Sequence, residues 1–66
     1  MAKIIRVLEH NDIIFKEDDY VLVTFENAKQ IRGKIRFPVL TESMMVGEYD
    51  LSTYEIERIK HIKKLN

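Results

Sequence analysis

Residues 20–37 read YVLVTFENAKQIRGKIRF, and this stretch decides the fold. Both ends of it alternate apolar and polar residues, which is the two-residue period of a strand with one buried face. A short polar connection separates them, so we predict a β-hairpin. We expect the buried face to hold Val21, Val23, Phe25, Ile31, Gly33, Ile35 and Phe37, and the outer face to hold Tyr20, Leu22, Thr24, Glu26, Gln30, Arg32, Lys34 and Arg36.

Two positions within this hairpin predict its shape. The connection is Glu26-Asn27-Ala28-Lys29, and Asn27 is the residue that best accepts a positive φ in a tight turn. Gly33 interrupts the second strand, where a glycine marks a bend or bulge or allows another backbone to come close. Of these two interpretations we favour the bend.

Length and composition predict one small domain, residues 1–66, of an ordinary soluble kind. A chain of 66 residues buries only about 60% of the surface that its unfolded form exposes, so its core is thin. It has no cysteine, which excludes disulfides and thiolate metal sites and leaves oligomerisation as a brace. Its apolar runs are too short for a spanning helix or a secretory signal, so we expect a cytoplasmic protein.

The formal net charge of zero conceals blocks of one sign. Residues 29–37 carry four cations and no anion, residues 38–57 carry five anions and no cation, and residues 58–66 again carry four cations alone. Such blocks pair either within the fold or between copies of the chain. They make attraction of the whole surface to nucleic acid unfavourable but leave room for a local basic patch.

The segments before the hairpin predict short strands and turns. Residues 1–9 are rich in β-branched residues and predict one strand. Residues 10–12 (HND) predict a turn, residues 13–15 (IIF) a second short apolar run, and residues 16–19 (KEDD) an acidic turn whose aspartates hold the backbone. The acidic turn lacks the spacing and the glycine of a calcium loop.

The segment after the hairpin begins with Pro38, which predicts that the strand stops there or follows a sheet edge. Residues 40–47 predict a loop, and we expect the methionine pair Met44-Met45 to fill gaps in the core rather than form an adaptable surface. Residues 48–51 predict either one more short strand or the lead into the last element.

The last segment, residues 52–65, supports two interpretations. Ser52 and Glu55 form a capping-box pattern, and acidic residues precede basic ones, so local chemistry favours one helix. The isoleucines, however, recur every three residues, so their stripe drifts around a helix. The alternative is a helical turn over residues 52–57 and a closing strand over residues 59–65 that pairs with residues 1–9. We favour the helix and keep the strand open.

The string EDDYVLVTFENAKQIRGKI, residues 17–35, resembles the opening of SH3-like and Sm-like small β-barrels. In such barrels an acidic or glycine turn, an alternating strand, a tight turn and a strand of the form x-G-x-I follow one another. The resemblance implies a mainly β, SH3-like barrel of about five short antiparallel strands, here with a C-terminal helix or helical turn. The Sm signature that holds uracil is absent, and fold similarity alone implies no function.

The sequence contains no catalytic or cofactor motif. It has no glycine-rich elbow, no phosphate-binding loop and no regular spacing of metal ligands, so we expect neither an enzyme nor a cofactor or metal. The two histidines, His10 and His61, are expected on the surface.

One candidate site remains, on the outer face of the hairpin. Cations alternate along one strand beside aromatic, apolar and hydroxyl side chains on its neighbour, a pattern that suits a protein partner or a second copy. We therefore expect a non-catalytic interaction module; the alternative is a nucleic-acid-binding barrel that adds the C-terminal lysines as phosphate contacts. The partner-binding candidates are Tyr20, Leu22, Thr24, Arg32, Lys34 and Arg36, and the phosphate-contact candidates are Lys60, Lys63 and Lys64.

Overall fold

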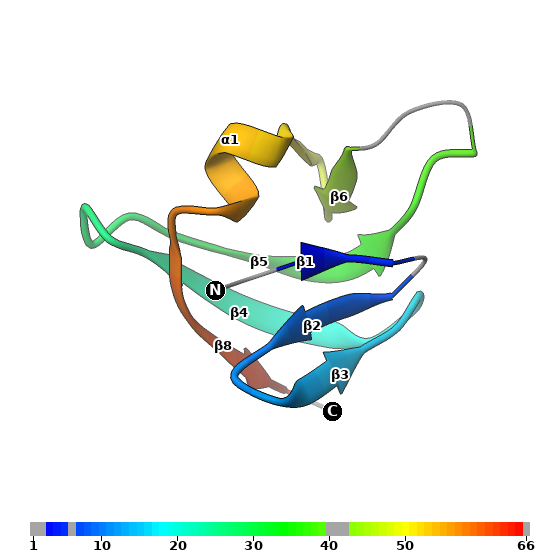
Figure 1. The fold of residues 1–66 in the computed structure, drawn as a ribbon, viewed down its shortest axis with the longest axis horizontal. Helices are drawn as coiled ribbons and strands as arrows, with labels where there is room; N and C mark the ends of the chain where they lie inside the picture. The colour runs from blue at the N-terminus through cyan, green and yellow to red at the C-terminus, as the bar shows by residue number, and fades with distance from the viewer. Residues whose placement is uncertain (1–2, 6, 40–42, 66) are drawn as a thin grey trace.

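A computed structural model describes residues 3–5, 7–39 and 43–65 and shows a mainly β protein with two antiparallel sheets (Figure 1). The small sheet has the order β1-β2-β3, and the large sheet has the order β7-β6-β5-β4-β8. The described strands form these two sheets and not one closed barrel. No described helix is long and apolar enough to cross a membrane. The elements are β1 (Lys3–Ile4), β2 (Leu8–His10), β3 (Ile13–Phe15), β4 (Tyr20–Phe25), β5 (Gln30–Arg36), β6 (Met44–Val46), β7 (Tyr49–Leu51), α1 (Thr53–Ile56) and β8 (Ile59–Lys64).

The predicted hairpin is confirmed as β4 and β5, the centre of the large sheet. Val21 lies opposite Gly33 and Val23 opposite Ile31 in an antiparallel register. Burial alternates along both strands as the sequence predicts, because successive side chains point to opposite faces. The core receives side chains from both sheets, and its buried apolar members are Leu8, Phe15, Val21, Val23, Phe25, Ile31, Ile35, Met44, Val46, Leu51, Ile56, Ile59 and Ile62.

The turn between β4 and β5 differs from the prediction in one residue. Ala28, not Asn27, has the positive φ, at 71°. Asn27 instead accepts a hydrogen bond at its Oδ1 from the Lys29 N–H at 3.0 Å. The asparagine therefore stabilises the turn through its side chain, and the strained backbone falls on the next residue.

Gly33 allows another backbone to come close, which is the second of the two interpretations of this glycine. The bend, which we favoured from the sequence, is not the main reason for a glycine here. The β4–β5 register continues through Gly33 without a shift. A Cβ at Gly33 would lie 2.5 Å from the Gly47 Cα and 2.6 Å from its N. Gly47, in the turn between β6 and β7, donates its N–H to the Lys34 carbonyl at 2.9 Å. Gly33 thus lets the β6–β7 hairpin lie directly on β5.

The single strand expected over residues 1–9 is wrong. The chain reverses between Ile5 and Val7, where the Ile5 N–H donates to the Val7 carbonyl at 2.8 Å, so β1 and β2 form a hairpin of their own. The turn expected at residues 10–12 is confirmed at Asn11 and Asp12, which have φ of 50° and 66°, as in a type I′ turn. β3 follows as expected.

The acidic turn after β3 is held by Asp19, as predicted. The Asp19 Oδ2 accepts from the Lys16 N–H at 2.9 Å, and the Asp19 N–H donates to the Lys16 carbonyl at 3.1 Å. Asp19 is buried, whereas Asp18 is exposed with φ of 75°. The turn also pairs with β5, since the Asp18 N–H donates to the Ile35 carbonyl at 2.9 Å.

The loop expected over residues 40–47 contains strand β6, so that prediction is wrong for residues 44–46. Residues 40–42 lie outside the described part. Met44 is fully buried in the core, as expected, and Met45 is half-buried. The strand expected at residues 48–51 is confirmed as β7, and β5 ends at Arg36, two residues before Pro38.

The prediction of one helix over residues 52–65 is wrong. The alternative, a helical turn followed by a strand, is correct in its elements, but the predicted pairing of that strand is wrong. Ser52 caps α1 with a complete capping box, yet the helix ends after Ile56. β8 then pairs with β4 and not with residues 1–9. The register shifts between Thr24 and Phe25, which makes a β-bulge at Lys60. This bulge lets Ile59 and Ile62, three residues apart, share the buried side of a strand.

Candidate functional site

The fold brings the predicted partner-binding residues onto one outer face of the large sheet. Tyr20 lies opposite Lys34, and Leu22 lies opposite Arg32. Residues directly opposite one another project from the same face. Arg36 continues the exposed side of β5 beyond these pairs, and Thr24 continues that side of β4.

β8 extends this face on the other side of β4. Lys63 lies opposite Leu22, and His61 lies opposite Thr24. Leu22 therefore has Arg32 on one neighbouring strand and Lys63 on the other. We call this surface the basic face; it consists of Tyr20, Leu22, Thr24, Arg32, Lys34, Arg36, His61 and Lys63.

The three lysines proposed as phosphate contacts do not act together. Only Lys63 joins the basic face. Lys64 lies opposite Val21, and its Nζ is 3.6 Å from the Asp19 Oδ2 and 5.7 Å from the centre of the Phe15 ring. Lys60 occupies the β-bulge, where its carbonyl lies 3.3 Å from the Nε2 of His10. The sequence analysis did not predict that Lys63 and Lys64 lie on opposite sides of the sheet. The two-residue period of a strand over residues 59–65 would have indicated it.

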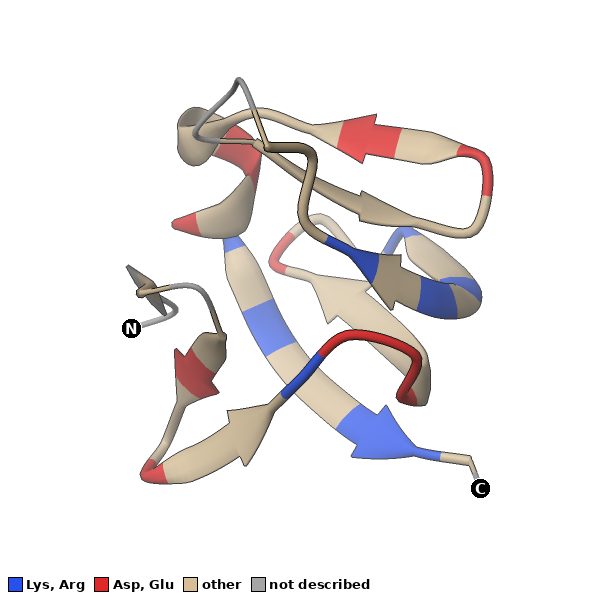
Figure 2. Cartoon of the chain, turned by 90° about the vertical axis from the view of Figure 1, so that its right-hand side faces the viewer, with Lys and Arg blue, Asp and Glu red and all other residues tan. Residues whose placement is uncertain are grey.

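The cations of the basic face are mostly without a neutralising partner. Arg36 pairs with Asp18 at 3.8 Å, an exposed contact. Within the described ranges, Arg32, Lys34 and Lys63 form no ion pair. Figure 2 shows lysine and arginine positions along β5 and along the strand that leads to the C-terminus, with the acidic turn nearby. The face therefore carries positive charge around a half-buried Leu22.

The helix expected over residues 52–65 does not continue beyond Ile56. The segment expected to form that helix is β8, which lies beside Leu22 in the sheet. The aliphatic stems of Arg32 and Lys63 can shield such a leucine while their charges stay in water. An apolar residue framed by cations is the arrangement of an interface centre with a charged rim.

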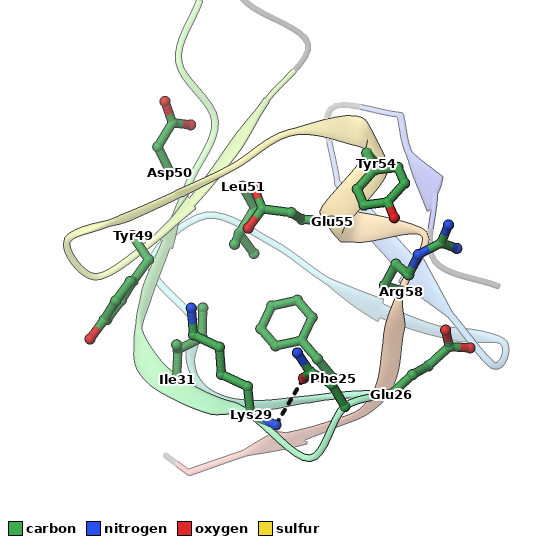
Figure 3. Close-up of a pocket in the computed structure, with 11 residues that line it drawn as sticks. Phe25, Glu26, Lys29, Ile31, Tyr49, Asp50, Leu51, Tyr54, Glu55 and Arg58 are labelled. Carbon is green, nitrogen blue, oxygen red and sulfur yellow. Dashed lines mark hydrogen bonds between the residues drawn. The ribbon is translucent and has the colours of Figure 1, made fainter.

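A second feature is a pocket of about 520 Å³ at one end of the molecule, between the β4–β5 turn, β7 and α1 (Figure 3). Its apolar lining comes from Phe25, Ile31 and Leu51, all buried. Tyr49 and Tyr54 stand on opposite sides of Phe25 and are exposed by 51% and 64%. The charged lining residues are Glu26, Lys29, Asp50, Glu55 and Arg58.

Both cations of the pocket lie over tyrosine rings. The guanidinium carbon of Arg58 is 4.3 Å from the centre of the Tyr54 ring, and the Lys29 Nζ is 6.0 Å from that of Tyr49. A hydrogen bond to Tyr54 is the largest cause that raises the pKa of Arg58. The rings of Tyr49 and Tyr54 thus each have a cation of the same chain near their faces.

The histidines offer no metal site. His10 is buried at 5% exposure, which corrects the expectation of a surface histidine, whereas His61 is exposed as expected. The His10 Nε2 lies 3.3 Å from the Lys60 carbonyl, so the ring joins β2 to the bulge of β8. Its Nδ1 is buried and has no hydrogen-bond partner among the described residues. Across the described part of the chain, no three His, Cys, Asp or Glu residues gather as metal ligands.

Comparison with protein-family models, with curated proteins and with solved structures finds no match. The resemblance to SH3-like and Sm-like barrels therefore stays a prediction that rests on residues 17–35.

Proposed function

We propose that this chain is a non-catalytic interaction module that binds an acidic protein surface through the basic face. The observation that carries the proposal is the placement of Arg32 and Lys63 on the two sides of Leu22, with neither charge neutralised by a described residue. A partner would cover the leucine and pair with the cations around it. Arginine and tyrosine, which lie beside this leucine, are among the residue types that most often dominate the binding energy of an interface.

The charge around the face favours a protein over nucleic acid. The acidic turn approaches the basic face, where Asp18 pairs with Arg36. A phosphate backbone that follows β5 would meet this carboxylate, and the whole chain has no net charge to attract a polyanion. Tyr20 supplies only one exposed ring for base stacking on the face.

Nucleic-acid binding remains the second candidate because Lys63 adds a further cation, across β4 from Arg32. The two candidates differ in their response to salt. Phosphate binding should weaken steeply between low and moderate salt, and loss of one phosphate contact should reduce the slope by about one.

A binding assay with two labelled probes tests the proposal. The probes are an acidic peptide of glutamate with interspersed leucine and a single-stranded oligonucleotide of equal charge. We expect the peptide to bind more tightly, and Arg32→Gln or Lys34→Gln to weaken it about threefold to tenfold, which is about 0.7–1.4 kcal/mol. Lys16→Gln is the matched control, since Lys16 is an exposed cation in the acidic turn.

A second pair of variants tests the apolar centre. Leu22→Ser should reduce peptide binding by at least as much as loss of one cation, whereas Ile14→Ser, at an exposed isoleucine of β3, should not change it. If the oligonucleotide binds and the peptide does not, the second candidate replaces the first. If neither probe binds at low salt, the basic face is only a solvated surface.

A further inference from the structure

Few charges of the described part of the chain form ion pairs within the fold. Over the described residues the ion pairs are Arg36–Asp18 and Lys64–Asp19, and both use the acidic turn. Among the described residues, the acidic ones that follow β6 take part in no ion pair. The sequence left open whether the charge blocks pair within the fold or between copies. Among the described residues, ion pairs within the fold are confined to the acidic turn, so pairing between copies remains for the other blocks.

Part of this acidic block lines the pocket. Asp50 and Glu55 belong to it, and Glu26 at the β4–β5 turn adds a third carboxylate to the lining. Against these stand Lys29 and Arg58, so three negative and two positive charges leave the pocket with one negative charge.

The pocket is also shaped and lined for a cationic side chain. Tyr49 and Tyr54 are largely exposed, and each already has a cation of the chain near its ring. An apolar floor lies between them, which suits the aliphatic stem of an arginine or lysine. An aromatic wall with excess carboxylate is a favourable site for such a group.

We infer that this pocket receives the basic face of a second copy of the chain. The inference rests on the proposed function of the basic face and names its partner. Arg32 or Lys34 of one copy would enter the pocket of the next, and Leu22 and Tyr20 would be covered beside Tyr49 or Tyr54. The two contacting surfaces are different, so the association is head-to-tail and leads to a ring or a chain of copies.

Sedimentation and light scattering of the wild-type chain give the first test. At low salt we expect the apparent mass to rise with concentration to at least twice the monomer mass of 7.9 kDa, and to return to the monomer as salt is added. The double variants Arg32→Glu/Lys34→Glu and Glu26→Lys/Asp50→Lys should each remain monomeric, because the first removes the net positive charge of the basic face and the second makes the pocket positive. All four positions are exposed.

Paramagnetic labelling gives the second test and uses the absence of cysteine from the chain. A nitroxide on Thr53→Cys, next to Tyr54, is mixed with ¹⁵N-labelled wild type. We expect the nitroxide to broaden the amide signals of Leu22, Arg32 and Lys63 in the ¹⁵N-labelled wild-type copy. A nitroxide on Asn11→Cys, in the exposed β2–β3 turn, is the control and should not broaden them.

The outcomes separate this inference from the proposed function. A wild-type chain that is monomeric at all concentrations, or broadening centred on the pocket itself, overturns the inference. If the acidic peptide still binds the basic face in that case, the proposed function stands with a different partner. If the peptide fails as well, both fall.

Discussion

The sharpest prediction concerns Gly33, because the position of the whole β6–β7 hairpin depends on it. In Gly33→Ala the new Cβ would lie 2.5 Å from the Gly47 Cα and 2.6 Å from its N. Ordinary carbon contacts are about 3.5–4.0 Å, so the two backbones must separate by about 1 Å. The φ of 156° adds strain, because side chains rarely adopt it.

The magnitude follows from these two effects. Forced overpacking costs about 1–3 kcal/mol, and an unfavourable backbone conformation costs about 1–3 kcal/mol more. Together they amount to about 2–6 kcal/mol. A chain of this length has a free energy of unfolding of about 3–10 kcal/mol, at 0.05–0.15 kcal/mol per residue. Gly33→Ala should therefore lose much or all of its stability.

Urea denaturation followed by circular dichroism measures this loss. Gly47→Ala is the matched control: its Cβ would lie 3.1 Å from the Arg32 carbonyl oxygen, and its φ is 61°. We expect it to cost about 1–2 kcal/mol, mainly through its left-handed backbone. A Gly33→Ala variant that loses less than about 0.5 kcal/mol would refute the close contact between β5 and the β6–β7 turn.

Three further changes test other contacts by the same denaturation measurement. Ala28→Gly should stabilise the chain by up to about 1 kcal/mol by removing left-handed strain at φ 71°; a loss of stability would contradict this turn. Ser52→Ala should cost about 1 kcal/mol because the helical turn loses its cap, and an unchanged midpoint would show that α1 needs none. His10→Ala should cost about 2–4 kcal/mol by emptying a buried site between β2 and β8, whereas His61→Ala, at an exposed position, should change stability by less than about 0.5 kcal/mol. Equal effects of the two histidine changes would contradict the burial of His10.

Local alternation was enough to determine the central hairpin and the row of cations on its outer side. The period of two places Arg32, Lys34 and Arg36 on one side of β5 wherever that strand lies in the molecule. Pairing with β4 then brings Tyr20 and Leu22 beside them in a register set by the short turn. These features depend on neighbours within about fifteen residues, which is why the sequence predicted them.

The conformation of the C-terminal segment, and its contribution to the basic face, depend on tertiary contacts. Ser52 and Glu55 favour a helix locally, whereas the three-residue spacing of the isoleucines does not, and one helical turn does form. The residues from Ile59 onward form a strand instead, since the edge of β4 offers hydrogen bonds and buries Ile59 and Ile62 together across a bulge. That bulge sends Lys63 to the basic face and leaves Lys64 beside Asp19. A contact between strands more than thirty residues apart made this choice, and the local pattern, which allowed a strand here, does not identify β4 as its partner.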